Sequence, residues 1–405
     1  MNPSPESIAG RYGTPVYIHR QELVERANSD LLALLPAPCR LYFSLKANPN
    51  HHIGSILHRG GCHAEISSTG ELASAIRAGF DVADALYTGP GKTAGEIATA
   101  LAAGVVTFSC ESLDDLRRVA DAAVAADVVA RCLLRVNGPA AHGNSAMRMT
   151  GAATQFGIDI ATATFTAADL DIDGVDVVGL HFFPVSNVVD ETVLIAEILA
   201  SISHARAFAD RLGISVRLLD LGGGFAAPYG RDGVRPTYPN LRSAVSDALD
   251  TSFPGWRDGA PVVAFESGRY LTCDSGTLVA EVTEIKSSGG REFVITDTGI
   301  HHVGGLSGIG RVPPISATVV GAAGAESGAA AVVGPLCTPA DVLNHRSDLA
   351  GAKPGDLVTI PNVGAYGISA SLMGFLSRPA PAEVVTDGDR VVAASVLETT
   401  RRDLP

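Results

Sequence analysis

The chain has 405 residues and a formal net charge of −13, and 46% of its residues are hydrophobic while 18% are charged. A negative chain without a basic run excludes nucleic acid as an expected partner. Residues 1–7 lack a signal-peptide pattern, and no apolar run approaches the roughly 18 residues that span a bilayer. Six scattered cysteines without a CxxC pair are typical of reduced thiols, so we expect a cytoplasmic protein without a membrane partner.

Short apolar segments alternate with amphipathic helical segments over about the first 265 residues. Eight strand–helix units over about 230 residues are the count and size of a (β/α)8 TIM-like barrel. Among the helices, 191–212 is the longest, and Thr69 and Ser112 are expected N-caps of two others. The predicted strands lie near residues 39–45, 62–66, 85–88, 105–108, 130–136, 175–181, 215–221 and 262–265.

After about residue 266 the pattern changes to β-branched apolar runs separated by Gly and Pro turns, which predicts an all-β domain. A chain of 405 residues is long for one hydrophobic core, which agrees with two domains. The predicted strand at 15–19 needs a sheet partner, and a closed barrel has no free edge to offer one. We therefore predict a barrel at 22–265 and a β-domain formed by 1–21 and 266–405.

Lys46 follows the predicted strand 41–45 and precedes a turn at Asn48. At the carboxyl end of a buried strand we expect apolar walls, and desolvation lowers the pKa of a lysine towards the free amine. A free amine can bond covalently to an aldehyde cofactor or a carbonyl substrate. A solvated lysine at a strand end is the alternative for this residue taken alone.

The ends of the last two predicted barrel strands carry a glycine triplet and an arginine. Barrels of this class place their chemistry at the carboxyl ends of the strands and commonly hold phosphate in the loops after strands 7 and 8. Successive glycines let backbone N–H groups approach an anion, although a triplet alone also fits a tight turn. The residues after strand 7 are Gly222, Gly223 and Gly224, and those ending or following strand 8 are Glu266, Gly268 and Arg269.

Other strand ends add groups suited to the same ligand. After strand 6, Ser186 could bind a phosphate and Phe183 could stack on a planar ring, while a turn serine and a core aromatic are equally good readings. Strand 2 ends near Glu65 and strand 5 near Arg135. A lysine, a phosphate cradle, a stacking aromatic and a carboxylate at one barrel mouth describe a pyridoxal 5′-phosphate site.

These residues carry a resemblance to the fold-type III pyridoxal-phosphate-dependent decarboxylases, the group that includes diaminopimelate, ornithine and arginine decarboxylases. The resemblance runs nearly end to end and implies a barrel with a carboxyl-terminal β-domain. Its motifs are Tyr12–Pro15, Tyr42–Asn48, Ser67–Leu72, Gln155–Ile158, Leu219–Phe225, Glu266–Arg269, Gly334–Cys337 with Asp341, Gly364–Gly367 and Pro379–Val384.

The resemblance implies roles for single residues. Lys46 would bind the cofactor covalently, and Glu266 would face the pyridine nitrogen and keep it protonated, which favours decarboxylation over racemisation. Cys337 would return a proton to Cα after CO2 leaves, although by spacing alone it reads as a buried free cysteine. Cys337 and Tyr366 would reach into the partner subunit, which implies a homodimer with composite sites. The phosphate would be held by Gly222, Gly223, Gly224, Ser186, Arg269 and Tyr366.

Three positions depart from the family pattern. Phe183 replaces the usual ring-stacking histidine, and Thr338 replaces the acid that usually reads a distal amine. The usual Arg-Pro segment after Gly299 is replaced by 300–305. The chain is therefore not expected to be a typical diaminopimelate or ornithine decarboxylase. It resembles instead the decarboxylases of natural-product pathways, some of which act on amino acids loaded on acyl-carrier proteins, and we hypothesise a substrate without a free distal ammonium.

Arg148, His301, His302 and Thr338 are candidates for substrate contact. The two histidines resemble metal ligands, but a site usually needs three or four ligands, so no metal is predicted. Arg148 reads equally well as a solvated side chain. A pyridoxal-phosphate-dependent racemase and a non-catalytic cofactor-binding partner are the alternative functions. The residues leave the substrate and its stereochemistry open.

Overall fold

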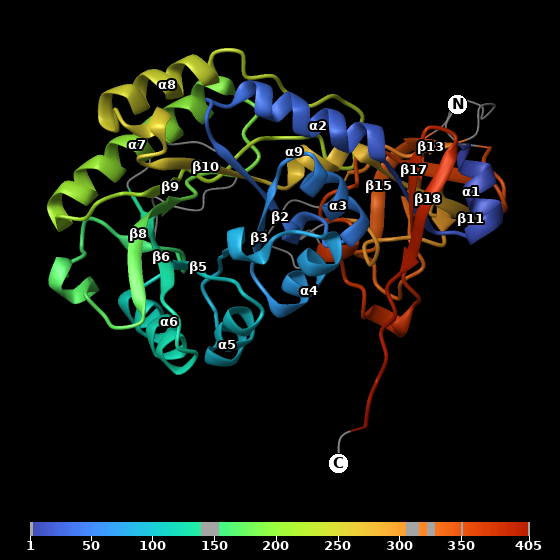
Figure 1. Cartoon of the computed structure of the whole chain (residues 1–405). Helices are drawn as coiled ribbons and strands as arrows, with labels where there is room; N and C mark the ends of the chain where they lie inside the picture. The colour runs from blue at the N-terminus through green and yellow to red at the C-terminus, as the bar shows by residue number, and fades with distance from the viewer. Residues whose placement is uncertain (1–2, 139–153, 305–315, 322–328, 350, 404–405) are drawn as a thin grey trace. The chain divides into compact units, whose positions relative to one another are not determined.

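The computed structural model describes residues 3–138, 154–304, 316–321, 329–349 and 351–403 (Figure 1). The chain divides into two compact units. One, here called the barrel unit, is Ala27–Ala227 with Pro236–Leu271, and the other, the β unit, is Met1–Arg26, Pro228–Arg235 and Thr272–Pro405. Residues 266–271 thus group with the barrel unit, and the short segment 228–235 groups with the β unit.

Eight parallel strands form the barrel. Neighbours pair in the order β5-β4-β3-β2-β10-β9-β8-β6, and β5 pairs with β6 to close the ring. The predicted (β/α)8 barrel is therefore confirmed, and each predicted strand coincides with an observed one. The strands are β2 (Arg40–Ser44), β3 (His63–Ile66), β4 (Leu86–Tyr87), β5 (Thr107–Cys110), β6 (Ala130–Asn137), β8 (Val175–Phe182), β9 (Leu218–Asp220) and β10 (Val262–Ser267), and β7 (Ile158–Asp159) pairs with β6 outside the ring.

Helices follow most of the strands, and side-chain caps set where they begin. Ser112 caps α6 as predicted, since its hydroxyl accepts the amide N–H of Asp115. The predicted cap at Thr69 is wrong by one residue: Ser68 has the extended backbone of a cap and accepts the amide of Glu71. The helices are α2 (Gln21–Leu34, within which the two units divide), α3 (His51–Arg59), α4 (Thr69–Ala78), α5 (Ala94–Ala102), α6 (Leu113–Ala125), α7 (Glu191–Leu212), α8 (Leu241–Ser252) and α9 (Arg269–Thr272).

Helix α7 is the one helix in the described part of the chain whose length and composition would allow it to cross a membrane. The expectation that no segment approaches that length was therefore too strict. The helix connects β8 and β9, and 44% of its most apolar window is buried. One helix of this kind is weak evidence for a membrane span, because the core helix of a soluble protein can have the same length and composition.

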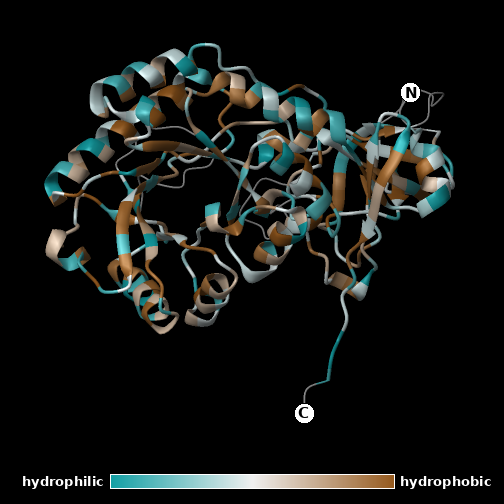
Figure 2. Ribbon diagram, viewed as in Figure 1, coloured by the Kyte–Doolittle hydropathy of each residue, from teal (hydrophilic) through white to brown (hydrophobic). Residues whose placement is uncertain are grey.

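The barrel interior is filled by one side chain from each of several strands. Tyr42, Leu86, Leu133, Val178, Leu218 and Ala264 pack together there. The strands accordingly appear mainly hydrophobic in Figure 2, whereas the helices around them carry both hydrophilic and hydrophobic residues. Burial of these apolar side chains is the main force that holds the strand ends, and thus the site, in a fixed arrangement.

The β unit is built on a mixed sheet. β1 (Val16–Arg20) runs antiparallel to β11 (Gly276–Ser288) and parallel to β17 (Ala382–Asp387). The prediction that the amino-terminal strand joins the later β-strands is confirmed. The remaining elements are α1 (Pro5–Tyr12), β12 (Arg291–Thr296), β13 (Val320–Gly321), β14 (Ala329–Val333), β15 (Val342–Asp348), β16 (Leu357–Ile360) and β18 (Arg390–Val396).

Candidate active site

The predicted cofactor residues of the barrel unit lie at, or directly after, the carboxyl ends of its strands. This is the edge at which barrel enzymes place their chemistry. Tyr366, Cys337, Thr338 and the histidine pair belong to the β unit, and Arg148 lies outside the described residues. The barrel-unit residues are Lys46, Glu65, Arg135, Phe183, Ser186, Gly222, Gly223, Gly224, Glu266, Gly268 and Arg269.

Lys46 lies in the 3-10 turn Leu45–Ala47 that directly follows β2. Its Nζ lies 3.3 and 3.2 Å from the two carboxylate oxygens of Glu65 and 5.5 Å from the ring centroid of Phe183. The side chain is 41% exposed. The expectation that apolar walls desolvate this amine is therefore wrong: the carboxylate of Glu65 and the ring of Phe183 lie beside it, and the side chain is partly exposed.

Glu65 is held by the ends of two neighbouring strands. The hydroxyl of Thr88 donates to its carboxylate, and Ser67 Oγ lies 3.4 Å from Oε1. Glu71 stands behind this pair, and its carboxylate accepts the amide of Ser67 at 2.7 Å. Burial, followed by the negative charge of Glu65, raises the pKa of Glu71 to about 7. Sequence reasoning named Glu65 but missed its supports, whose signal was the Ser/Thr residues at successive strand ends.

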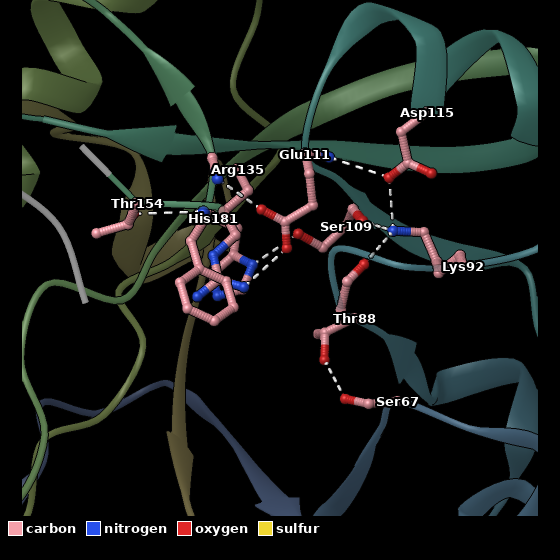
Figure 3. A network of polar contacts seen from close by, with 12 residues as sticks. Ser67, Thr88, Lys92, Ser109, Glu111, Asp115, Arg135, Thr154 and His181 are labelled. Carbon is pink, nitrogen blue, oxygen red and sulfur yellow. Dashed lines mark hydrogen bonds and ion pairs between the residues drawn. The ribbon is translucent and has the colours of Figure 1, made fainter. Parts of the chain in front are cut away.

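A chain of polar contacts continues around the strand ends (Figure 3). The buried Lys92 lies 2.6 Å from Asp115 and donates to the backbone oxygens of Ser109 and Gly89 at 2.7 and 2.8 Å. Asp115 also accepts the amide of Glu111 at 3.1 Å. These bonds satisfy a lysine that burial would otherwise penalise.

Arg135, predicted to contact the cofactor, is paired with a second buried carboxylate. Its Nη1 lies 2.8 Å from Glu111 Oε1, and its guanidinium lies 4.7 Å from the ring centroid of Phe156. Glu111 Oε2 accepts the amide of Gly157 at 2.6 Å. The arginine thus ties β6 to the segment 156–157, and sequence reasoning missed Glu111 as its partner.

Glu266 lies in a buried cluster with His181 and Asp220. An imidazole nitrogen of His181 and one carboxylate oxygen from each of Asp220 and Glu266 all lie within 4.8 Å of one another. They meet because β8 pairs His181 directly with Asp220 and β10 lies beside β9. His181 Nε2 lies 3.1 Å from Glu266 Oε1. Among the described side chains, His181 Nε2, Glu266 Oε1 and Asp220 Oδ2 are buried without an aligned hydrogen-bond partner, so the contact of His181 with Glu266 is close but not aligned as a hydrogen bond.

The two carboxyl groups of this cluster titrate far apart. Burial, followed by the charge of Glu266, raises the pKa of Asp220 to about 7. Burial also opposes ionisation of Glu266, but its contact with His181 and the charges of Lys46 and Arg135 outweigh burial and bring its pKa to about 2. Near neutral pH Glu266 is therefore fully ionised, whereas Asp220 is only partly ionised.

The glycine loop after β9 is close-packed. Gly222 and Gly224 have φ of +69° and +112°, which side chains other than glycine rarely adopt. A Cβ at Gly222 would lie 2.2 Å from Phe182 O, and one at Gly223 would lie 2.4 Å from Glu266 O. Val188 donates to Gly224 O at 2.8 Å, so the loop carrying Phe183 and Ser186 runs beside the glycine loop.

These features fit pyridoxal phosphate. A glycine turn suits a phosphate, the ring of Phe183 lies beside Lys46, and the carboxylate of Glu266, whose Oε1 has no aligned hydrogen bond, suits an N–H donor such as a protonated pyridine. The sharp turns at Gly222 and Gly224 and the contact of Gly268, where a Cβ would lie 2.6 Å from Ala47 Cβ, keep these elements close. Arg269 begins the four-residue α9 directly after Gly268.

The predicted residues of the β unit fall into exposed and buried sets. Cys337 is exposed, and Thr338 lies in a turn in which its amide donates to Leu336 O at 2.8 Å. The rule that a lone cysteine is buried thus fails here. Tyr366 has φ of +54°, and its carbonyl accepts the hydroxyl of Tyr229 at 3.0 Å.

His301 and His302 are buried and lie ring against ring, with centroids 3.6 Å apart. Burial lowers their pKa values to about 4 and about 3. His302 contacts Thr298 and Pro379, whereas neither ring nitrogen of His301 has a hydrogen-bond partner among the described residues. Both histidines are therefore neutral at neutral pH.

Comparison with known proteins identifies the family. The family model described as "Pyridoxal-dependent decarboxylase, pyridoxal binding domain" matches residues 21–273. The L-glutamyl-[BtrI acyl-carrier protein] decarboxylase of Niallia circulans is 31% identical over 94% of this chain and 90% of its own length. The diaminopimelate decarboxylase of Pseudomonas aeruginosa is 31% identical over 97% of this chain and 92% of its own.

Solved structures agree on the fold. Diaminopimelate decarboxylase from Helicobacter pylori superposes with a TM-score of 0.82 at 24% identity, covering 96% of this chain and 95% of that one. Lysine decarboxylase from Selenomonas ruminantium superposes with a TM-score of 0.79, also at 24% identity, covering 95% and 96% of the two chains. The chain belongs to the pyridoxal-dependent decarboxylases of fold type III and is a pyridoxal-phosphate-dependent carboxy-lyase acting on an amino acid or an amino-acid derivative.

Proposed function

We propose that this enzyme removes the α-carboxylate from an amino acid that an acyl-carrier protein presents. The observation that carries the proposal is the similarity over 94% of the chain to a relative named for a carrier-bound glutamyl substrate. Loss of the α-carboxylate as CO2 requires that group to be free. The carrier must then be attached through a side-chain carboxyl, as glutamate would allow.

The residue after Cys337 supports the same substrate class. Thr338 stands where the diaminopimelate and ornithine decarboxylases that the chain resembles carry an acid for a distal amine. A hydroxyl gives no counter-charge to an ammonium group. A side chain masked as a thioester needs none, so the proposed substrate fits the absence of the acid.

The cofactor would be held mainly by the barrel unit. Lys46 would bind pyridoxal phosphate covalently, and Ser186, Arg269 and the glycine loop would hold its phosphate. Tyr366 would add a hydroxyl from the β unit, and Phe183 would cover one face of the ring. When bound, pyridoxal phosphate supplies a protonated ring that accepts the electron pair left at Cα when CO2 departs.

The protein's own groups would then control protons and orientation. Glu266, ionised in its buried cluster, would hold the proton on the ring nitrogen. Glu65 would hold Lys46 by the ion pair already seen at 3.2 Å. The exposed thiol of Cys337 would deliver a proton from Sγ to Cα of the product.

We propose that the enzyme is a homodimer in which Cys337 and Tyr366 serve the partner's barrel. Mixing Lys46→Ala and Cys337→Ala chains tests this, because random reassociation would restore one intact site in half of the dimers. The mixture would regain about a quarter of the wild-type activity if sites are shared between chains. A mixture no more active than the two separate variants would contradict shared sites. It would leave the proposal about the substrate unaffected.

All six cysteines are free, at Cys39, Cys62, Cys110, Cys132, Cys273 and Cys337. Unpaired thiols are typical of reducing compartments. They support the proposal that the enzyme works in the cytoplasm.

A CO2-release assay tests the substrate. Free glutamate, lysine, ornithine and diaminopimelate would be compared with glutamate loaded on a carrier protein, with the unloaded carrier and the Lys46→Ala enzyme as controls. We expect kcat/KM for the loaded carrier to exceed that for any free amino acid by at least about 100-fold, since binding of the carrier adds to transition-state stabilisation. Faster turnover of free lysine, ornithine or diaminopimelate would overturn the proposal.

A further inference from the structure

The carboxylate of Glu266 touches a histidine whose other nitrogen is also engaged. His181 Nε2 lies 3.1 Å from Glu266 Oε1, and both side chains are at most 2% exposed. On the far side of the ring, His181 Nδ1 lies 2.7 Å from Ser109 Oγ (Figure 3). Ser109, His181 and Glu266 therefore form a buried line across three strands, β5, β8 and β10.

The serine decides which nitrogen of His181 carries the proton. Ser109 is fully buried, and its hydroxyl has no partner in the described part of the chain other than His181 Nδ1. The hydroxyl hydrogen is satisfied only if it is donated to Nδ1, because a buried donor left unpaired is costly. Nδ1 then accepts, and the proton of a neutral imidazole resides on Nε2.

The opposite tautomer would place the lone pair of Nε2 against the oxygen of Glu266. That arrangement brings two electron-rich atoms to 3.1 Å between side chains that are at most 2% exposed, and it is unfavourable. With the proton on Nε2, the ring instead places an N–H group 3.1 Å from the carboxylate oxygen, a favourable charge–dipole contact even though the two atoms are not aligned as a hydrogen bond. The serine thus acts on Glu266 through the histidine, in the way that outer partners orient metal-bound or catalytic imidazoles.

The neighbouring Asp220 does not compete for this contact. Its Oδ1 accepts the amide of Gly222 at 2.8 Å. Its raised pKa, caused first by burial and then by the charge of Glu266, leaves much of it neutral near pH 7. Glu266 is therefore the more fully ionised carboxylate of the cluster, and its Oε1 lies 3.1 Å from His181 Nε2.

We propose that Ser109 and His181 are positioning residues that hold the carboxylate of Glu266 ionised and aimed at the ring nitrogen of pyridoxal phosphate. The inference rests on the role proposed for Glu266. It adds that Ser109 and His181 set the strength of the contact between Glu266 and the ring nitrogen, although neither residue touches the cofactor in the role proposed for it.

Binding of two cofactors to the apoenzyme tests the proposal without any substrate. Pyridoxal phosphate and its 1-deaza analogue differ only in the ring nitrogen, which the analogue replaces with a C–H group. The quantity measured is the ratio of their dissociation constants. For the wild type we expect pyridoxal phosphate to bind about 10- to 100-fold more tightly than the analogue, because a charge-assisted hydrogen bond is lost.

The variants separate positioning from a merely structural role. His181→Leu should reduce the ratio to near 1 and leave binding of the deaza analogue unchanged, and Ser109→Ala should reduce it by about 3- to 10-fold. His181→Gln, whose amide N–H can replace Nε2–H, should retain most of the ratio. His63→Leu, the same substitution at the amino end of β3, should leave the ratio at the wild-type value.

Glu266→Gln separates the role of Glu266 at the ring nitrogen from the positioning role of Ser109 and His181. If it lowers the ratio and His181→Leu does not, the positioning role is wrong while the role of Glu266 stands. If Glu266→Gln itself leaves the ratio unchanged, the proposed role of Glu266 fails as well. Equal weakening of both cofactors by His181→Leu would show a structural role only and would also overturn the proposal, and the unchanged affinity for the analogue serves as the test of intact folding.

Discussion

The barrel unit gathers charged side chains at the carboxyl ends of its strands and pairs them, whereas the β unit buries two neutral histidines and exposes Cys337. In the barrel unit, Glu65 meets Lys46 and Glu111 meets Arg135. In the β unit, His301 has no hydrogen-bonded ring nitrogen among the described residues, and Cys337 is exposed. The first unit is thus preorganised for a charged ligand, while the second presents a thiol at its surface.

The same contrast appears between two lysines within the barrel unit. Lys92 is buried and holds Asp115 at 2.6 Å, so its three donors are occupied by Asp115, Ser109 and Gly89. Lys46 is 41% exposed and pairs with one carboxylate. Burial with full pairing is a structural use of a lysine, and partial exposure beside an acid leaves an amine that a cofactor can reach.

The largest effect is expected at Lys46. Lys46→Ala should lower decarboxylation by at least about 10,000-fold, since covalent cofactor binding is lost, and it should abolish the near-visible absorbance of the bound cofactor. Lys46→Arg keeps a cation beside Glu65 but cannot form the covalent bond, so it should be equally inactive. Recovery of activity in the arginine variant would show that only the charge matters.

The next effect tests the buried cluster. Glu266→Gln should lower kcat by about 100- to 1,000-fold, because a neutral amide cannot hold a proton on the ring nitrogen. Asp220→Asn, a change of the same size beside it, should cost less than about 10-fold, since Asp220, with a pKa of about 7, carries only part of a negative charge near pH 7. Steady-state kinetics with the substrate that the enzyme decarboxylates measures kcat of both variants. Equal losses in the two variants would contradict the division of charge between the two residues.

Cys337→Ala should lower kcat by about 10- to 100-fold and leave thermal stability unchanged, because the exposed thiol makes little packing contact. In D2O the wild type should introduce deuterium at one face of Cα. The variant should give a mixture of the two deuterated configurations, because another group then delivers the deuteron. Cys273→Ala, a buried cysteine of the same unit, is the matched control and should lower stability rather than the rate of protonation. A fully active Cys337→Ala enzyme would remove the residue from the mechanism.

The smallest effect concerns the histidine pair. The pKa values of His301 and His302 lie below the unfolded value, at about 4 and 3, because burial disfavours their charged forms. The unfolded chain therefore binds more protons than the folded chain between about pH 3 and 6.5. The free energy of unfolding is not reduced by these histidines above pH 6.5, and it decreases as the pH falls below that value. Each histidine adds at most about 1.4 kcal/mol per pH unit to the slope.

His301→Phe should remove about half of that slope and leave stability at pH 8 unchanged or raised by about 1 kcal/mol, because no hydrogen bond is lost. Urea unfolding at pH 5 and pH 8 measures the slope. His302→Phe is the comparison, since it loses the contact to Pro379 and should be destabilising at both pH values. A wild-type slope in His301→Phe would mean that this histidine is not buried as described.

Strand ends and turn residues could be predicted from the sequence, because apolar runs and glycines report local backbone structure. The eight barrel strands and the sharp loop at Gly222 are of this kind. Partners that strand register brings together could not. His181 and Asp220 are 39 positions apart and become neighbours only when β8 pairs with β9.

Local solvent exposure was the other limit. The run before Lys46 suggested apolar walls, yet the amine faces Glu65 from the adjacent strand and is partly open. Likewise, Arg135 was predicted as a cofactor-site residue, and the sequence did not show that it pairs with Glu111. A single sequence shows which strand end carries a charge, but not which opposite charge lies across from it.

The central claim is that Lys46 is the lysine prepared for pyridoxal phosphate. The chain has four lysines, Lys46, Lys92, Lys286 and Lys353. The most direct measurement reduces the cofactor-loaded enzyme with borohydride, digests it and locates the modified lysine by mass spectrometry. The account predicts modification of the peptide that contains Lys46 and none at the buried Lys92. Modification at Lys92, Lys286 or Lys353 with Lys46 unmodified would contradict it.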